Sequence, residues 1–325
     1  MSTAVQPEKI LKDLQKLWID LGKEDSQKGS AGVLRACAMT LIAAVEEEAD
    51  AQAVGETIAN LVHQHPSRVI VMRITADQAP HLDARVFAQC WMPFGRRQQI
   101  CCEQIEITAS EPRVADLPNL VLGLMAPDLP VVLWSRGERL CRDASFQQLF
   151  PLTNKIIVDS ASFSDPDVAL KFIRRVISGG SNVADLAWTR LTHLREIIAQ
   201  IFERENALAH LHSLQRVAIS YEGRTPVDAT TMPTWLHYLM AWFRTTLPIP
   251  VDPVYRGTAA EYSIAGISIE GPGFRGSVEL HDAVADVTVN ELTRRIAFPK
   301  RSDCDLLREE LSVVRVDEIF RRVIA

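Results

Sequence analysis

The chain has 325 residues, a formal net charge of −6 and 47% hydrophobic residues, which is typical of a globular protein of about two domains. The mildly acidic balance and the lack of a basic block exclude a surface for the phosphate backbone, so we expect no nucleic-acid partner. No apolar run approaches the roughly 18 residues of a membrane span, and the amino terminus lacks a signal-peptide core. We therefore expect a cytoplasmic protein with no membrane partner.

The first predicted element is a helix at the amino terminus. Apolar residues recur at helical spacing from Pro7 to Leu21, and a polar stretch follows, so residues 1–32 are predicted as a helix and linker. The next segments predict a buried strand, a helix that ends at a proline, and a second buried strand, at 33–45, 50–66 and 68–74. This succession is a βαβ unit.

Strands and helices continue to alternate up to Gly180. Strands are predicted at 85–92, 99–108, 130–134 and 155–159, and helices at 114–124 and 165–177. Such alternation indicates a mostly parallel sheet with helices on both faces. We therefore predict an α/β domain over residues 33–180.

The pattern changes after Gly180. A helix is predicted at 184–202, then a strand at 216–222, a tryptophan-rich helix at 232–243, short alternating strands over 262–289 and a helical tail after Ser302. These segments predict an α+β domain with antiparallel strands over residues 181–325.

Signature motifs of enzymes are absent or out of context. The run "GPGFRG", Gly271 to Gly276, matches a dinucleotide fingerprint by its letters, but an alternating strand follows it where a helix is needed, so we predict a hairpin loop. No Walker A or G-x-S-x-G motif occurs, and no cysteines form a C-x-x-C pair. We expect no catalytic residues, no cofactor and no metal. The acidic run Glu46 to Glu48 is interpreted as a solvated strand end.

One arginine stands inside the apolar face of the predicted helix at 184–202. Helical geometry projects Arg190 between Ile197 and Ile201, and a buried arginine needs either an internal carboxylate or a partner that covers it. Arg195 falls beside Trp188, where the two side chains can stack. Trp188, Arg190 and Arg195 are our candidate partner-binding residues, with internal pairing of Arg190 as the alternative.

Three cysteines lie close together on two predicted strands. Cys101 and Cys102 are neighbours on one strand, so their side chains point to opposite faces and should not bridge each other. Cys90 lies on the preceding strand, and hairpin pairing would bring one of the two thiols near it. All six cysteines of the chain are expected to be reduced thiols. Cys90, Cys101 and Cys102 are our candidate redox residues.

Three segments carry a family resemblance. They read "HPSRVIVMR" (65–73), "PDLPVVLWSRG" (127–137) and "ADLAWTRLTHLRE" (184–196), and in this order and spacing they resemble the glucose-6-phosphate dehydrogenase assembly protein OpcA family over nearly the whole chain. The resemblance implies a noncatalytic factor that binds glucose-6-phosphate dehydrogenase, favours its active oligomer and raises flux into the oxidative pentose phosphate pathway. In cyanobacterial members the enzyme's activity is tied to thioredoxin through family cysteines, so thioredoxin is a further candidate partner.

The alternative function is an enzyme or sensor that binds a sugar phosphate or a nucleotide. Ligands of open α/β sheets bind beyond the carboxyl ends of parallel strands, where Trp134, Ser135 and Arg136 follow one predicted strand. Arg136 would then hold a phosphate. The structural interpretation of the same loop is a surface turn closed by Gly137.

Overall fold

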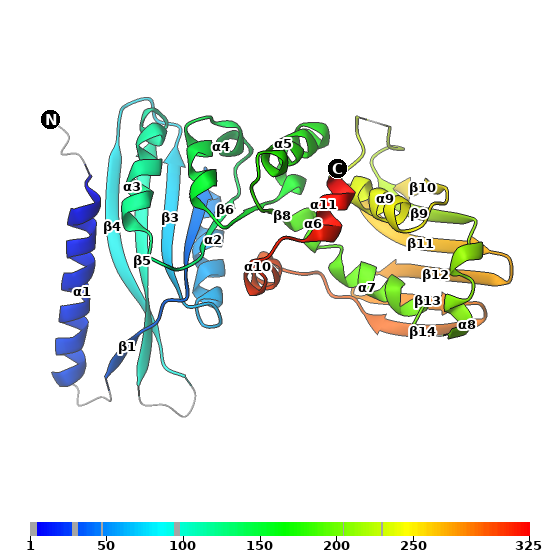
Figure 1. The fold of residues 1–325 in the computed structure, drawn as a ribbon, viewed down its shortest axis with the longest axis horizontal. Coiled ribbons are helices and arrows are strands. Elements are labelled where there is room, and N and C mark those ends of the chain that lie inside the picture. Colours follow the sequence, from blue (N-terminus) through cyan, green and yellow to red (C-terminus); the bar gives the residue numbers. More distant parts are fainter. Residues whose placement is uncertain (1–4, 28–31, 47, 94–97, 204, 229) are drawn as a thin grey trace. The chain divides into compact units, whose positions relative to one another are not determined.

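A computed structural model describes residues 5–27, 32–46, 48–93, 98–203, 205–228 and 230–325. Its contacts divide the chain into two compact units (Figure 1). The first unit comprises residues 1–162, 176–184 and 303–316, and the second comprises 163–175, 185–302 and 317–325. The predicted domains divide the chain once, at residue 180. In the structure three segments lie on the other side of that division: 163–175 belongs to the second unit, and 181–184 and 303–316 belong to the first. We describe each unit by itself.

An eight-stranded sheet forms the centre of the first unit. Its strands follow the order β1-β5-β3-β2-β6-β7-β8, and β4 pairs with β5. Pairing is parallel from β1 to β7, and only β4 runs antiparallel to its neighbour. The strands are β1 Val33–Arg35, β2 Met39–Val45, β3 Ser67–Thr75, β4 Leu82–Trp91, β5 Gln99–Ser110, β6 Val131–Ser135, β7 Lys155–Val158 and β8 Val183–Asp185. The predicted α/β class with a mostly parallel sheet is confirmed.

The strand order identifies the topology. Counted from β2 and without the antiparallel strand, the order from β5 to β8 is 3-2-1-4-5-6, which is that of doubly wound nucleotide-binding folds. The segment 33–45, which was predicted as one strand, forms two. Residues 33–35 pair with β5 as β1, and the chain pairs with β3 as β2 from Met39 onward.

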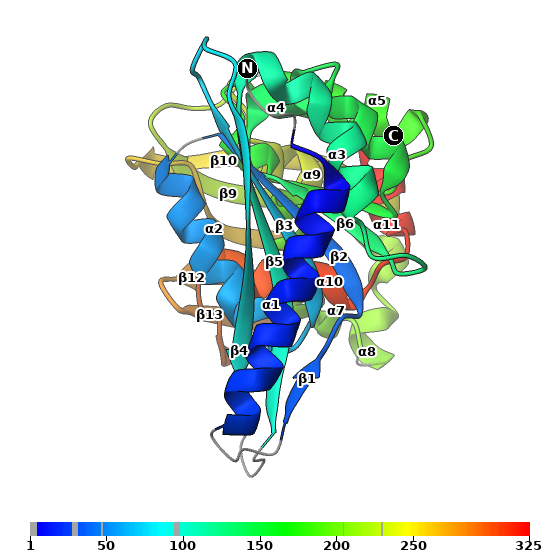
Figure 2. The ribbon, with the colours of Figure 1, turned by 90° about the vertical axis from the view of Figure 1, so that its left-hand side faces the viewer.

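Helices cover this sheet, and the first of them is part of the unit. Helix α1 packs against α3 and β4, and α2 packs against β2 and α10. Figure 2 shows α1 crossing in front of β4 and β5. The helices are α1 Pro7–Gln27, α2 Glu48–Leu61, α3 Leu117–Leu124, α4 Glu138–Arg142 and α10 Asp303–Ser312, with 3-10 turns at η1 Glu111–Asp116, η2 Phe146–Leu152 and η3 Ser160–Ser162.

A buried carboxylate holds α1 on the sheet. Glu103 on β5 is 3% exposed, and its Oε1 accepts a hydrogen bond from the Trp18 indole at 2.6 Å and pairs with Arg35 at 2.7 Å. Its Oε2 pairs with Arg68 at 2.7 Å, and Arg68 also donates to the Leu124 carbonyl at 2.9 Å. Both carboxylate oxygens are therefore compensated, which is the condition for burying such a charge.

The second unit is built on a six-stranded sheet. The strand order is β10-β9-β11-β12-β13-β14, and every pair is antiparallel except β10 with β9. The strands are β9 Arg216–Gly223, β10 Val251–Thr258, β11 Ser263–Gly271, β12 Phe274–His281, β13 Val284–Val289 and β14 Leu292–Ala297. The predicted α+β class with antiparallel strands is confirmed.

The "GPGFRG" segment is a hairpin turn, as predicted. Gly271 pairs with Phe274 across the β11–β12 hairpin, and Gly273 has φ of +72°. Proline followed by a residue with positive φ is the pattern of a type II turn, where glycine is favoured. No helix follows these glycines, so the segment cannot present a helix N-terminus to a dinucleotide.

The helices of the second unit differ from prediction at one point. They are α5 Pro166–Ser178, α6 Leu186–Thr189, α7 Thr192–Ile201, α8 Glu205–Leu208, α9 Thr234–Thr246 and α11 Glu318–Ile324, with a 3-10 turn at η4 Leu211–Ser213. The predicted continuous helix at 184–202 is wrong. It is interrupted at Arg190 and Leu191, where the Leu191 N–H donates to the Trp188 carbonyl three residues back and so tightens the turn.

We expect Glu103→Ala to lower the free energy of unfolding by about 3–5 kcal/mol, because it leaves the buried Arg68 without its carboxylate. Glu106→Ala on the same strand is the matched control. Glu106 pairs with Arg73 at 3.2 Å in a partly exposed position, so its loss should cost about 0–1 kcal/mol. Urea unfolding of the two variants measures both values, and equal losses would contradict the anchoring role of Glu103.

Candidate functional site

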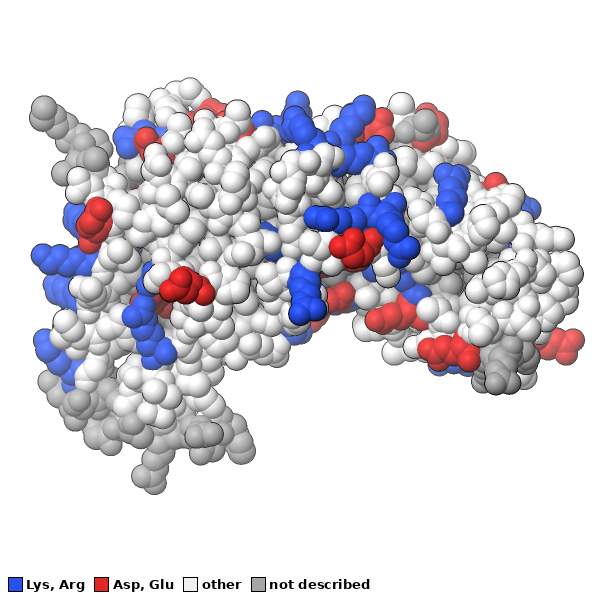
Figure 3. Space-filling view, in the orientation of Figure 1, with Lys and Arg blue, Asp and Glu red and all other residues white. Residues whose placement is uncertain are grey.

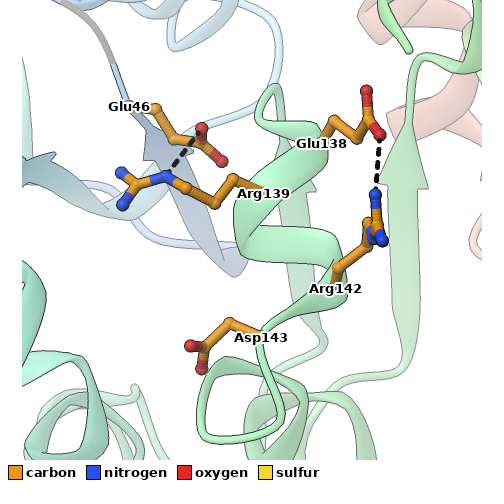
Figure 4. A pocket seen from close by; sticks show the side chains of 5 residues that line it. All are labelled: Glu46, Glu138, Arg139, Arg142 and Asp143. Atoms are coloured by element: carbon orange, nitrogen blue, oxygen red, sulfur yellow. Dashed lines mark hydrogen bonds and ion pairs between the residues drawn. The ribbon is translucent and has the colours of Figure 1, made fainter. Parts of the chain in front are cut away.

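The first sheet has a switch point between β2 and β6. The chain passes from β2 to β3 on one side and reaches β6 on the other, and in such sheets ligands bind beyond the carboxyl ends of the two strands. A hollow of about 400 Å³ opens beside the end of β2 and is lined by Glu46, Glu138, Arg139, Arg142 and Asp143 (Figure 4). This hollow is where the topology predicts a ligand.

The Glu46 carboxylate occupies part of the place where the topology predicts a ligand. Its Oε1 accepts a hydrogen bond from the Leu140 backbone N–H at 2.6 Å, and its Oε2 pairs with Arg139 at 3.4 Å. A Cβ on Gly137 would lie 1.9 Å from the same Oε1, so the carboxylate rests directly against the start of α4. The prediction of a solvated strand end is wrong for Glu46, whose side chain is only 17% exposed, because helix N–H groups attract an anion.

The turn after β2 is also unlike a dinucleotide site. In dinucleotide-binding members of this topology the turn is glycine-rich, and the helix behind it receives the pyrophosphate. Here the sequence from 46 to 50 is Glu-Glu-Glu-Ala-Asp, and α2 begins at Glu48. Residue 47 lies outside the described residues. The glycine-rich turn of a dinucleotide site is thus missing from this sequence.

The two arginines of the hollow are paired within the chain, and Asp143 accepts a hydrogen bond from the Phe146 backbone N–H at 2.8 Å. Arg139 also bonds Glu111 at 2.6 Å, and Arg142 pairs with Glu138 at 3.3 Å. Hydrogen bonds from Gln78 and Arg139 hold the pKa of Glu111 below its ordinary value. The hollow is therefore an ion-paired surface, with its cations already matched by carboxylates.

The residues of the alternative ligand site lie mostly in the interior. Trp134 and Ser135 are buried, and the Ser135 hydroxyl accepts a hydrogen bond from the Cys141 thiol at 3.4 Å. Arg136 pairs with Asp303 of α10 at 2.7 Å and lies 5.7 Å from the Trp134 ring centre. In this arrangement the three side chains hold the end of β6 in place.

A buried aspartate organises the start of α6. Asp185 is fully buried, and its Oδ1 accepts a hydrogen bond from the Ala187 N–H at 3.0 Å, which caps the helix. Its Oδ2 accepts one from the Tyr238 hydroxyl of α9 at 2.6 Å. Sequence reasoning missed this residue, although an aspartate directly before a helix is a capping signal.

Trp188 joins three elements of the second unit. Its indole donates to Asp317 at 2.9 Å, and its ring packs against Tyr238 and Phe320. The predicted stacking with Arg195 is present, with the guanidinium 3.6 Å from the ring centre. Trp188 is 2% exposed, because its ring packs against side chains of its own unit. The prediction that Trp188 binds a partner therefore needs correction.

Arg190 and Arg195 are both partly exposed. Arg190 lies at the break after α6, so the projection that placed it inside the apolar arc does not apply. Arg195 also donates to the Thr192 hydroxyl at 3.1 Å, which together with the Trp188 ring fixes the direction of its guanidinium. Contact with a partner stays a prediction for these two arginines.

The candidate redox residues lie on both faces of β5. Cys90 and Cys101 are directly opposite each other in the β4–β5 pair and form a disulfide, so the expectation of reduced thiols is wrong for these two. Cys102 points to the other face, donates to the Ala36 carbonyl at 3.4 Å, and does not bridge Cys101. Burial raises the pKa of Cys102 to about 11. Residues 94–97 of the connecting loop lie outside the described residues.

Charged residues are spread over the face drawn in Figure 3, where acidic and basic side chains stand singly or in small groups between uncharged ones. Within the described part of the chain, no helix is long and apolar enough to cross a membrane. In the same residues, no three His, Cys, Asp or Glu side chains are grouped so as to hold a metal ion.

Two family models match the chain. Residues 59–175 match the glucose-6-phosphate dehydrogenase subunit N-terminal domain, and residues 181–324 match the C-terminal domain of the same subunit, both under the name OpcA. Relatives named OxPP cycle protein OpcA come from Nostoc punctiforme, 27% identical over 63% of this chain and 42% of the relative, and Synechococcus elongatus, 27% identical over 66% and 46%. The chain thus matches less than half the length of these relatives.

Solved structures share the fold. A dehydrogenase from Chromobacterium violaceum superimposes with a TM-score of 0.50 at 7% identity, covering 91% of this chain and 92% of that one. At this identity the likeness concerns architecture alone.

We expect Gly137→Ala to lower the free energy of unfolding by about 1–3 kcal/mol, because the new methyl group overlaps the Glu46 carboxylate. The loss should shrink in a Glu46→Ala background, where nothing remains to overlap, and a double-mutant cycle by thermal or urea unfolding measures the coupling. Gly257→Ala is the control, since a Cβ there meets nothing within 4 Å. Strictly additive losses would contradict the packing of Glu46 against the start of α4.

Proposed function

Because the chain belongs to the OpcA family of glucose-6-phosphate dehydrogenase assembly proteins, we propose that it is a noncatalytic assembly factor and allosteric activator of that dehydrogenase. It binds the enzyme and promotes its active oligomer in the oxidative pentose phosphate pathway. The observation that carries the proposal is the Glu46 carboxylate at the start of α4, since it occupies the place where an enzyme of this topology would hold its ligand. The pairing of Arg136 with Asp303 supports this function over the alternative of a sugar-phosphate or nucleotide site.

Activation of the dehydrogenase then follows from preferential binding to its active oligomer. A partner that binds the active oligomer more tightly than the inactive species shifts the population toward the active one, by as much as the two affinities differ. No catalytic group of the assembly factor is required for this effect. Arg190 and Arg195 are candidates for the contact, and Arg195 is suited to it because Trp188 and Thr192 hold its guanidinium in one direction.

Mixing the purified chain with its cognate dehydrogenase should give a larger particle and a lower apparent KM or a higher turnover. Light scattering and substrate saturation on the same samples measure both. Arg195→Ala should weaken the complex, whereas Arg216→Ala, which removes an exposed arginine paired with Asp252, should not. Unchanged kinetics in a sample that contains the complex would contradict the activator role. For Arg190→Ala, lower affinity with unchanged unfolding supports an anchor, and lower stability supports internal pairing.

We also propose that the Cys90–Cys101 disulfide regulates this binding. Its reduction takes up two electrons and two protons from a dithiol such as thioredoxin and leaves two thiols. Cys101 and Glu103 lie on the same face of β5, because alternate residues of a strand share a face. The cross-link therefore sits beside the carboxylate that holds α1, and opening it removes the covalent link between β4 and β5 beneath this helix, while their backbone pairing remains.

Dithiol treatment should raise the affinity for the dehydrogenase in the native chain and have no effect in a Cys90→Ser, Cys101→Ser double variant. Cys102→Ser is the control and should respond as the native chain does, since Cys102 points to the other face. Titrations under dithiol and under oxidant measure the four affinities. A double variant that still responds would show that this pair is not the switch.

A further inference from the structure

The last strand of the second sheet has an unpaired edge. Among the described strands only β13 pairs with β14, which ends the strand order. Five of its six residues are exposed, and it contains neither proline nor a register shift that would break the ladder. The backbone N–H and C=O groups that face away from β13 can therefore accept a further strand.

A hollow with a partly apolar lining lies beside this strand. It has a volume of about 230 Å³, and its apolar side chains are Ile201 of α7, Val287 and Val289 of β13, and Leu292 of β14. Gln200, Thr293 and Arg294 complete its lining. Val287 pairs with Arg294 and Val289 with Leu292, so all four strand residues share one face of the sheet. Leu292 is 71% exposed, which leaves an apolar rim at a place where a partner side chain can enter.

The charges at the edge are not balanced within the chain. Arg295 points to the opposite face and bonds both carboxylate oxygens of Asp286, at 2.7 and 2.9 Å. Arg294 is exposed beside the hollow, and no carboxylate of the described residues forms an ion pair with it. A ligand of this edge is therefore expected to bring a negative charge.

This imbalance argues against a second copy of the chain as the occupant. Two β14 strands that pair antiparallel about their centre would place Arg294 opposite Arg295, and a shift by one position would place two equivalent arginines opposite each other. Like charges directly opposite in a ladder are destabilising. An acidic segment of a different protein removes this repulsion.

We propose that β14 is a docking edge for an extended segment of the partner dehydrogenase, with an apolar side chain in the hollow and a carboxylate against Arg294. The inference rests on the proposed function and names the surface through which it acts. Main-chain hydrogen bonds to the free edge supply affinity, and the hollow and Arg294 supply selectivity, as in other cases of strand addition.

The test compares three variants with the native chain in titrations against the purified cognate dehydrogenase. Leu292→Asp removes the apolar rim, and Arg294→Glu reverses the charge. Arg275→Glu is the control, because Arg275 is also an exposed arginine and lies on the interior strand β12 of the same sheet, where it pairs with Glu270 at 3.5 Å. Each edge variant should bind roughly tenfold more weakly or worse, and the control should stay within about twofold. Equal unfolding midpoints show that the variants are folded.

Hydrogen exchange on the complex provides an independent readout. The outward N–H groups of β14 should become protected when the dehydrogenase binds, in the native chain and not in Arg294→Glu. Native binding that is insensitive to both edge substitutions and leaves β14 unprotected overturns the docking edge and leaves the proposed function standing. A native chain that does not bind the dehydrogenase at all overturns both. Self-association that Arg294→Glu changes would identify a second copy as the occupant and overturn the proposal.

Discussion

The position of the Glu46 carboxylate decides what the first unit can hold. The strand order of its sheet creates a crevice at the ends of β2 and β6, and this crevice is a ligand site in most proteins of the topology. Here an internal anion bonds the Leu140 N–H and Arg139 and is packed against Gly137. The strand order of nucleotide-binding folds is thus present, and a carboxylate of the chain itself lies beside the switch point of the sheet. Fold and activity are separable for this reason.

A different set of interactions stabilises the second unit. Asp185 bonds Tyr238, and Trp188 bonds Asp317 and supports Arg195, so helices α6, α9 and α11 are tied together by polar contacts in a mostly apolar surrounding. Most contacts of residues 184–196, one of the three segments that carry the family resemblance, therefore stabilise the second unit. Arg190 and Arg195 of this segment are partly exposed.

Much of the fold could be predicted from sequence because buried parallel strands are continuous apolar runs. The strands β2, β3, β6 and β7 and most helices follow from this pattern. The edge strands β10 and β14 could not be predicted in the same way. Pro253 interrupts the first, and the two adjacent arginines of the second hide any alternation of apolar residues.

The candidate site was less predictable, because its contacts join residues far apart in the chain. The spacing of the cysteines predicted that Cys101 or Cys102 would approach Cys90 across the strands, since pairing in a hairpin is a local property, and the structure selects Cys101. The bond from Leu140 to Glu46 spans 94 residues, and the bond from Trp188 to Asp317 spans 129. Periodicity carries no information about such contacts. It also predicted one continuous helix over 184–202, which the tightened turn at Leu191 interrupts, so the helical projection of Arg190 does not apply.

We propose that the chain, whose first sheet has the strand order of nucleotide-binding folds, binds no nucleotide and acts on the dehydrogenase instead. Titration calorimetry of NADP+ into the isolated chain, over a range that saturates dehydrogenases, is the decisive measurement. We expect no binding by the native chain, because the Glu46 carboxylate bonds the Leu140 N–H at the start of α4 and would repel a phosphate there. Stoichiometric binding of NADP+ to the native chain would contradict it.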